Sequence, residues 1–120
     1  MHEFASVDSF VFAVLHEIDR RGLGPIRTVR ARRSASFVDE AVRQVFEYLT
    51  RGTKLENVRL ELEASVPHVH CTCGHEQVLG ENDIAGIPVE CQSCGAVVQT
   101  HPQPDLELLE LVEKGRHAHR

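Results

Sequence analysis

Two close pairs of cysteines constrain the fold of this 120-residue chain more than any other feature of its sequence. They lie between residues 71 and 94, in a segment without aromatic residues, whereas every Phe and the one Tyr fall within the first 48 residues. Such a segment buries too little apolar surface to fold on a hydrophobic core alone. We therefore expect residues 66–104 to form a module that a metal ion holds together.

A zinc site is the interpretation of these cysteines that we favour. The pairs are Cys71-Thr-Cys73-Gly74 and Cys91-Gln-Ser-Cys94-Gly95. Two such turns supply four thiolates, a closed tetrahedral ligand set, and zinc binding of this kind contributes roughly 10–16 kcal/mol to folding. Two disulfides are disfavoured because the chain shows no secretion signal, and a redox Cys-x-x-Cys needs only one pair. Because four protein ligands leave no open position, we expect the zinc to be structural.

The first cysteine pair is irregular, since one residue separates its cysteines where the second pair has two. If Cys71 and Cys73 both bind, they complete a Cys₄ site with Cys91 and Cys94. If His70 binds in place of Cys71, the two-residue gap to Cys73 is kept and the site is Cys₃His. We favour the Cys₄ site because thiolate is the better zinc donor. The sequence leaves open the roles of three nearby histidines, His68, His75 and His101.

The rest of the chain carries the periodicity of an α+β domain. Apolar residues at helical spacing predict helices over residues 3–21 and from Ser36, an expected N-cap, to Arg51-Gly52. Alternating apolar and polar residues predict strands over residues 26–33, 57–63 and 105–112. We expect two helices packed on a three-stranded sheet, with a zinc-ribbon-like module inserted between two of its strands. The expected domains are residues 1–65 with 105–120, and residues 66–104.

Charge and composition exclude several functional classes. Residues 1–60 hold ten Lys and Arg against eight Asp and Glu, and residues 61–120 hold three against ten, so +2 and −7 give the net −5. An acidic chain argues against nucleic-acid binding. No apolar run approaches the roughly 18–20 residues that cross a bilayer, so we expect a cytoplasmic protein without a membrane partner. No nucleophile triad or phosphate-binding glycine loop is evident, so we do not expect an enzyme.

Four arginines crowd the predicted strand over residues 26–33, at positions 27, 30, 32 and 33. We expect them to form a solvated strand face that the acidic last strand balances. A docking site for an acidic partner is the alternative interpretation.

The N-terminus offers a second candidate metal site. The Met1 amine, the His2 imidazole and the backbone amides of residues 2 and 3 can close fused chelate rings in one plane. Four nitrogens in a square plane suit Ni²⁺ or Cu²⁺. A histidine at position 2 is by itself weak evidence, because an incidental polar residue explains it better.

Four segments together resemble the nickel metallochaperone family HypA, called HybF in one branch. They are Met1-His2-Glu3 before a helix, Thr50-Arg51-Gly52-Thr53 after the second helix, the strand Leu60-Glu61-Leu62-Glu63, and the paired cysteines. The resemblance covers nearly the whole chain, to about Val112, and the Met-His-Glu start is its most specific part. The family usually has Cys-x-x-Cys at the first pair, and the Cys-x-Cys found here departs from that pattern at Cys71.

The resemblance implies an accessory protein that inserts nickel into [NiFe]-hydrogenase. It implies Ni²⁺ as cargo at Met1, His2 and Glu3, and structural Zn²⁺ at the four cysteines. It also implies two partners, a HypB-like GTPase and the hydrogenase large subunit, and leaves open whether the chain forms a homodimer. The alternative function is a zinc-ribbon module for protein or nucleic-acid interaction, in which His2 is incidental.

Overall fold

The chain divides into two compact units in the computed structural model. One combines Met1–Ala64 with Asp105–Arg120, and the other is Ser65–Pro104; we call them the helix–sheet unit and the cysteine unit. The structure describes residues 2–66, 68–79, 87–100 and 104–115, without the side chain of His2. Met1, a predicted nickel ligand, and His101, whose role the sequence leaves open, therefore lie outside the described residues. No helix in these ranges is long and apolar enough to cross a membrane.

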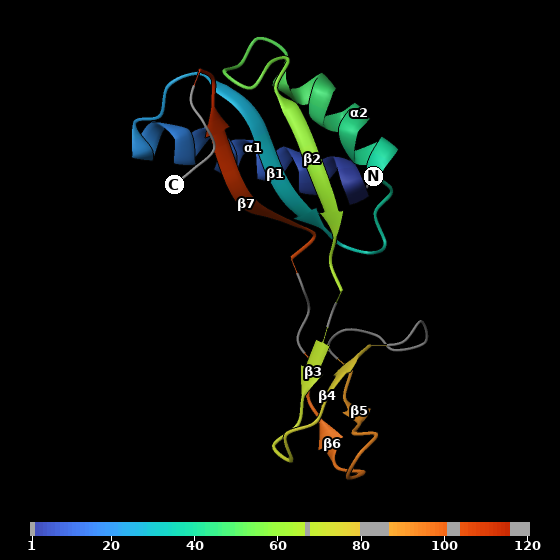
Figure 1. Cartoon of the computed structure of the whole chain (residues 1–120). Coiled ribbons are helices and arrows are strands. Elements are labelled where there is room, and N and C mark those ends of the chain that lie inside the picture. The colour runs from blue at the N-terminus through green and yellow to red at the C-terminus, as the bar shows by residue number, and fades with distance from the viewer. Residues whose placement is uncertain (1, 67, 80–86, 101–103, 116–120) are drawn as a thin grey trace. The chain divides into compact units, whose positions relative to one another are not determined.

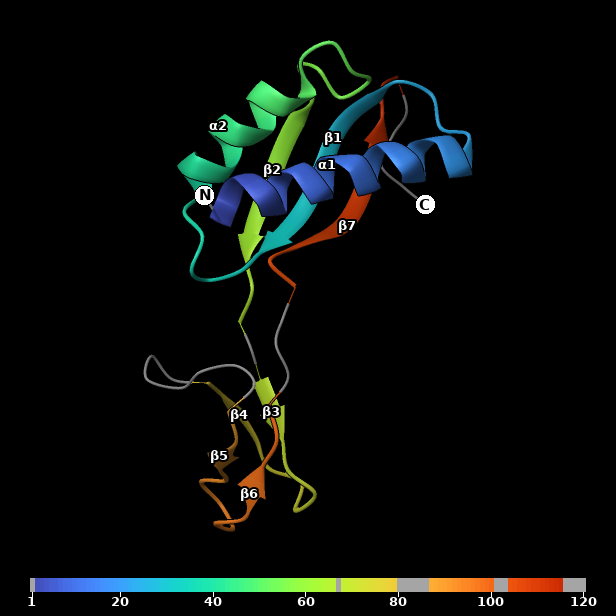
Figure 2. The same ribbon diagram turned by 180° about the vertical axis from the view of Figure 1, so that it is seen from behind.

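The helix–sheet unit has two helices on one face of a three-stranded sheet. Its elements are α1 (His2–Arg21), β1 (Ile26–Arg33), α2 (Asp39–Thr50), β2 (Arg59–Ala64) and β7 (Leu106–Glu113). The strand order is β2-β1-β7, with β1 parallel to β2 and antiparallel to β7. Both helices lie behind the sheet in Figure 1 and in front of it in Figure 2. This confirms the predicted α+β fold.

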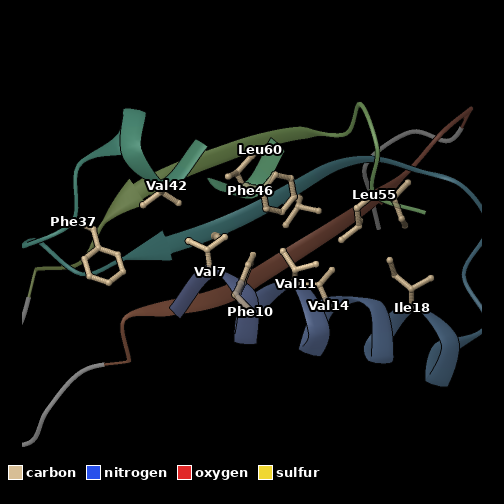
Figure 3. Close-up of a cluster of buried hydrophobic side chains, with 13 residues drawn as sticks. Val7, Phe10, Val11, Val14, Ile18, Phe37, Val42, Phe46, Leu55 and Leu60 are labelled. Carbon is tan, nitrogen blue, oxygen red and sulfur yellow. The ribbon is translucent and has the colours of Figure 1, made fainter. Parts of the chain in front are cut away.

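The core lies between the helices and the sheet (Figure 3). One stripe of α1 is buried there, and it consists of Val7, Phe10, Val11, Val14 and Ile18. From α2, Val42 and Phe46 project into the same space. The buried positions of α1 recur every three or four residues, as the sequence periodicity predicts.

The predicted capping of α2 by Ser36 is wrong. The helix begins at Asp39, Val38 occupies the N-cap position, and no side chain caps it. Ser36 instead shares a hydrogen bond of 3.0 Å with Ser34, in the turn that the Phe37 amide closes onto the Ser34 carbonyl. Phe37 is buried in the core, so packing of this ring places the turn where the local sequence favours a cap.

The start of β2 and the regularity of β7 also differ from the prediction, and both differences have local causes. Asn57 has a left-handed backbone with φ of 64°, in a turn that anchors Leu55 in the core, so β2 begins at Arg59. In β7, the pairing shifts from Arg30 with Glu110 to Ala31 with Leu108. Leu109 is left as an extra residue, a β-bulge, which explains why apolar and polar residues do not alternate strictly there.

Two arginines of β1, Arg30 and Arg32, lie among acidic side chains on the face of the sheet that the helices leave open, whereas Arg33 pairs with Asp39 at the start of α2. Arg30 contacts Glu110 at 3.0 Å, Glu63 at 3.4 Å and Glu61 at 3.8 Å. Arg32 contacts Glu107 at 3.4 Å. The expected balance by the last strand is thus confirmed for these two arginines, and β2 shares in it.

Candidate metal centre

The cysteine unit consists of two short hairpins, each of which carries one cysteine pair in its turn. In the first, β3 (His68–His70) pairs with β4 (Glu76–Val78), and residues 71–75 form the turn. In the second, β5 (Val89–Glu90) pairs with β6 (Val97–Val98), and residues 91–96 form the turn. Each hairpin therefore presents two sulfurs at its tip.

Both turns hold their first cysteine by the same kind of backbone hydrogen bonds. The Gly74 amide donates to the Cys71 carbonyl at 2.9 Å, and the Gly95 amide donates to the Cys91 carbonyl at 2.9 Å. Both glycines have positive φ, +96° and +79°, which side chains rarely allow. The Cys-x-Cys turn is one residue shorter, yet it closes on its glycine in the same way.

The four sulfurs lie at the corners of a small cluster, all within 4.8 Å of one another. The Sγ atoms of Cys71 and Cys94 are 3.6 Å apart, and those of Cys73 and Cys91 are 3.7 Å apart. A zinc ion with Zn–S bonds of about 2.3 Å places its sulfurs about 3.8 Å apart when it is tetrahedral. The separations exceed a disulfide bond and fit a tetrahedral ion. Zinc would be held here by four thiolates, with no position left for a substrate.

Backbone amides prepare one of these cysteines to bind a cation. The amides of Cys94 and Ser93 donate to the Cys91 sulfur and lower its pKa to about 6, against the opposing effect of burial. At Cys94 the Ala96 amide lowers the pKa, but hydrogen bonds with the other three sulfurs outweigh it and raise the pKa to about 11. Close sulfurs without a metal must share protons, and a divalent cation replaces those protons.

The histidines near the cluster take other positions. His70 directs Nδ1 toward the Glu76 carboxylate at 3.5 Å and is not one of the grouped ligands. Among the described residues, His75 Nε2 is buried without a hydrogen-bond partner, while the His75 carbonyl accepts from the Cys71 amide at 2.9 Å. His68 is exposed at the start of β3. The structure therefore brings Cys71 to the other three sulfurs and leaves His70 beside Glu76.

One residue at the cluster carries no signal in the sequence. The Gln77 side chain on β4 donates from Nε2 to the Glu90 carbonyl at 3.3 Å and accepts from the Gln92 amide at Oε1, at 2.9 Å. Its partners flank Cys91 on the other hairpin. Gln77 is 13 positions from Glu90 and 15 from Gln92. Contacts at such separations leave no periodic pattern in the sequence, so the sequence alone does not reveal them.

The N-terminal candidates are only partly described. Helix α1 begins at His2, and Glu3 is half-buried in its first turn. The backbone amides of residues 2 and 3 belong to the first turn of a helix, whose N–H groups have no acceptor within the helix. Two of the predicted nickel ligands are thus backbone groups without a partner inside the helix.

These features define a class of protein, a small α+β metal-binding protein with a closed four-cysteine site. The particular family follows from sequence comparison. The family described as "Hydrogenase/urease nickel incorporation, metallochaperone, hypA" matches residues 1–111. The chain belongs to this HypA family of nickel metallochaperones.

Named relatives agree with this assignment, and a solved structure shares the fold. The hydrogenase maturation factor HypA of Methylocella silvestris is 30% identical over 114 residues, which cover 92% of this chain and 97% of the relative. The factor of the same name from Methanothermobacter thermautotrophicus is 25% identical over 99 residues, covering 79% and 81%. The solution structure of the Ni metallochaperone HypA from Helicobacter pylori shares the fold, with a TM-score of 0.63, 17% identity, and coverage of 92% and 96%.

Proposed function

We propose that this chain carries Ni²⁺ at its N-terminus and delivers it to the large subunit of [NiFe]-hydrogenase, while zinc holds the cysteine unit. The observation that supports this proposal most directly is the closed cluster of Cys71, Cys73, Cys91 and Cys94. A member of a nickel-incorporation family must hold nickel reversibly. A tetrahedral thiolate cluster is a zinc site with no open position, so it is unsuited to a cargo that must leave. Nickel therefore needs another site.

The N-terminal segment supplies the nitrogen ligands that nickel prefers. We assign Met1, His2 and Glu3 to this site, with the Met1 amine, the His2 imidazole and the backbone amides of residues 2 and 3 as a square-planar set. The positive end of the helix dipole disfavours a cation at this position. The amides lose their protons when nickel binds, and their negative charge, together with that of the Glu3 carboxylate, offsets this unfavourable interaction. Under this assignment the helix–sheet unit carries the cargo and the cysteine unit carries the structural ion.

The same proposal defines the partners and the kind of activity. The chain transfers a metal ion and catalyses no reaction, and it works in the cytoplasm with a HypB-like GTPase. Both relatives compared above are named hydrogenase maturation factors, which supports hydrogenase as the recipient. The net charge of −5 and the pairing of Arg30 and Arg32 with glutamates support the expectation that nucleic acid is not a partner.

Native mass spectrometry of the untagged protein tests the nickel site. We expect one Zn²⁺ and one added Ni²⁺ per wild-type chain. His2→Ala, or two residues added before Met1, should abolish nickel binding and keep zinc. His16→Ala, on an exposed position of the same helix, is the matched control and should keep both metals. Unchanged nickel affinity in the His2 variant and the extended protein would refute the N-terminal site.

The zinc ligands are tested by two further variants at the irregular pair. Because the Cys71 sulfur lies 3.6 Å from that of Cys94, Cys71→Ser should lose zinc. His70→Ala should keep it, because His70 faces Glu76. Zinc content by elemental analysis decides between them, and loss of zinc in His70→Ala alone would establish the Cys₃His site instead.

A further inference from the structure

The two hairpins of the cysteine unit must meet to form the metal site, yet they do not share a sheet. β3 pairs with β4 and β5 pairs with β6 as separate two-stranded sheets. Each hairpin supplies two sulfurs, so the cluster forms only where the hairpin tips are correctly placed. The Gln77 side chain spans this junction between the hairpins.

The Gln77 amide binds the backbone on both sides of one metal ligand. It donates to the carbonyl of Glu90 and accepts from the amide of Gln92, and Cys91 lies between them. In an extended chain, the carbonyl before a residue and the amide after it point to the same side. The carboxamide thus takes the place that a neighbouring strand would occupy. Only one orientation of the carboxamide works, because Glu90 offers an acceptor and Gln92 a donor.

We propose that Gln77 is a positioning residue that fixes Cys91 for the metal and slows release of the ion. Within its own hairpin, Cys91 is already held by its amide, which donates to the Ala96 carbonyl at 2.8 Å. Gln77 adds two hydrogen bonds from the other hairpin, which carries Cys71 and Cys73. The inference rests on the zinc site proposed above and extends it to a residue that does not touch the ion. Groups that orient a ligand from outside commonly change metal affinity by about 10–100-fold.

Zinc release to a chromogenic chelator measures this role. Gln77→Met keeps the length of the side chain and removes both hydrogen bonds, so release should be roughly 5–30-fold faster than in the wild type. Gln77→Glu keeps the oxygen that accepts from the Gln92 amide, which is the shorter of the two hydrogen bonds. Its zinc release rate should lie between those of the wild type and Gln77→Met. Gln99→Met changes an exposed glutamine of the same unit and should release zinc at the wild-type rate.

Two further measurements separate positioning from a general loss of structure. The Co²⁺-loaded proteins should all show the spectrum of four thiolates in a tetrahedron, because no ligand changes. The Gln92 amide proton should be protected from solvent exchange in the wild type and Gln77→Glu, and unprotected in Gln77→Met. A wild-type protein without zinc or this Co²⁺ spectrum would refute the proposed zinc site itself. Normal zinc binding with equal release rates in wild type, Gln77→Met and Gln99→Met would overturn the role of Gln77 alone.

Discussion

The two units of this chain are stabilised in different ways. The helix–sheet unit buries thirteen hydrophobic residues in one cluster, drawn from both helices, two strands and two loops. Among its described residues, the cysteine unit buries three, Val69, Cys71 and Cys91, and two of these are predicted metal ligands. In the ranges that the structure describes, each unit exposes four large hydrophobic side chains, and those of the smaller cysteine unit are Val66, Val78, Ile87 and Val97. A small unit of this composition depends on cross-links, whereas the larger one depends on its core.

The strands show the same difference. Those of the helix–sheet unit run for six to eight residues, and those of the cysteine unit for two or three. A two-stranded hairpin this short is not stable by itself in water. The cysteine unit is therefore stabilised by its turns, which carry the sulfurs, and not by its strands.

Removal of zinc should have the largest effect, and it should unfold one of the two units and leave the other folded. A strong chelator should unfold the cysteine unit, since metal binding supplies on the order of 10–16 kcal/mol to sites of this kind. The helix–sheet unit should stay folded. In an amide NMR spectrum, dispersion should collapse for residues 68–78 and 89–98 and persist for the helices. Dispersion that persists in both units after zinc loss would contradict the comparison.

A core substitution should have the opposite pattern and a smaller effect. Phe46→Ala removes a buried ring between α2 and the sheet, and such changes cost about 3–5 kcal/mol. The melting temperature of the helix–sheet unit should fall while zinc content stays at one ion per chain. Phe12→Ala is the matched control, because Phe12 is 74% exposed on α1 and should change stability little. A matching loss of zinc would show that the units fold as one.

Removal of a surface charge should have the smallest effect. Arg30→Gln takes away the cation that Glu61, Glu63 and Glu110 share on the open sheet face. The melting temperature should fall slightly at low salt, because the three carboxylates then repel one another, and the difference should shrink in about 1 M salt. A fall as large as that of Phe46→Ala, and independent of salt, would mean that this face contributes to stability by packing instead.

The sequence predicts most of the helix–sheet unit because its signals are periodic. Most of the buried stripe of α1 and the full extent of β1 follow from spacing alone, although the helical spacing also includes Phe4, which is 40% exposed. Ser36 and Leu55 could not be predicted in the same way, because burial of Phe37 and the turn at Asn57 depend on the packed core. The closeness of Cys71 to Cys94 was suggested by the pairing of cysteines, whereas the hydrogen bonds of Gln77 arise only when two hairpins meet. Nickel binding by Met1, His2 and Glu3 stays a prediction.

The sheet register bears on how strongly the two units can influence each other. Ala64 at the end of β2 and Leu106 at the start of β7 both pair with Arg33 of the central strand. The ends of the insertion are thus two strand spacings apart, about 10 Å. For the sheet, residues 65–104 are a loop whose closure entropy rises by only about 0.6 kcal/mol per doubling of length. Replacing the insertion by four or five residues would lower the free-energy cost of loop closure by about 2 kcal/mol. Ordering the insertion with zinc can therefore stabilise the sheet by no more than about this amount. The register therefore allows evolution or engineering to shorten, exchange or unfold the insertion at little cost to the domain that holds it.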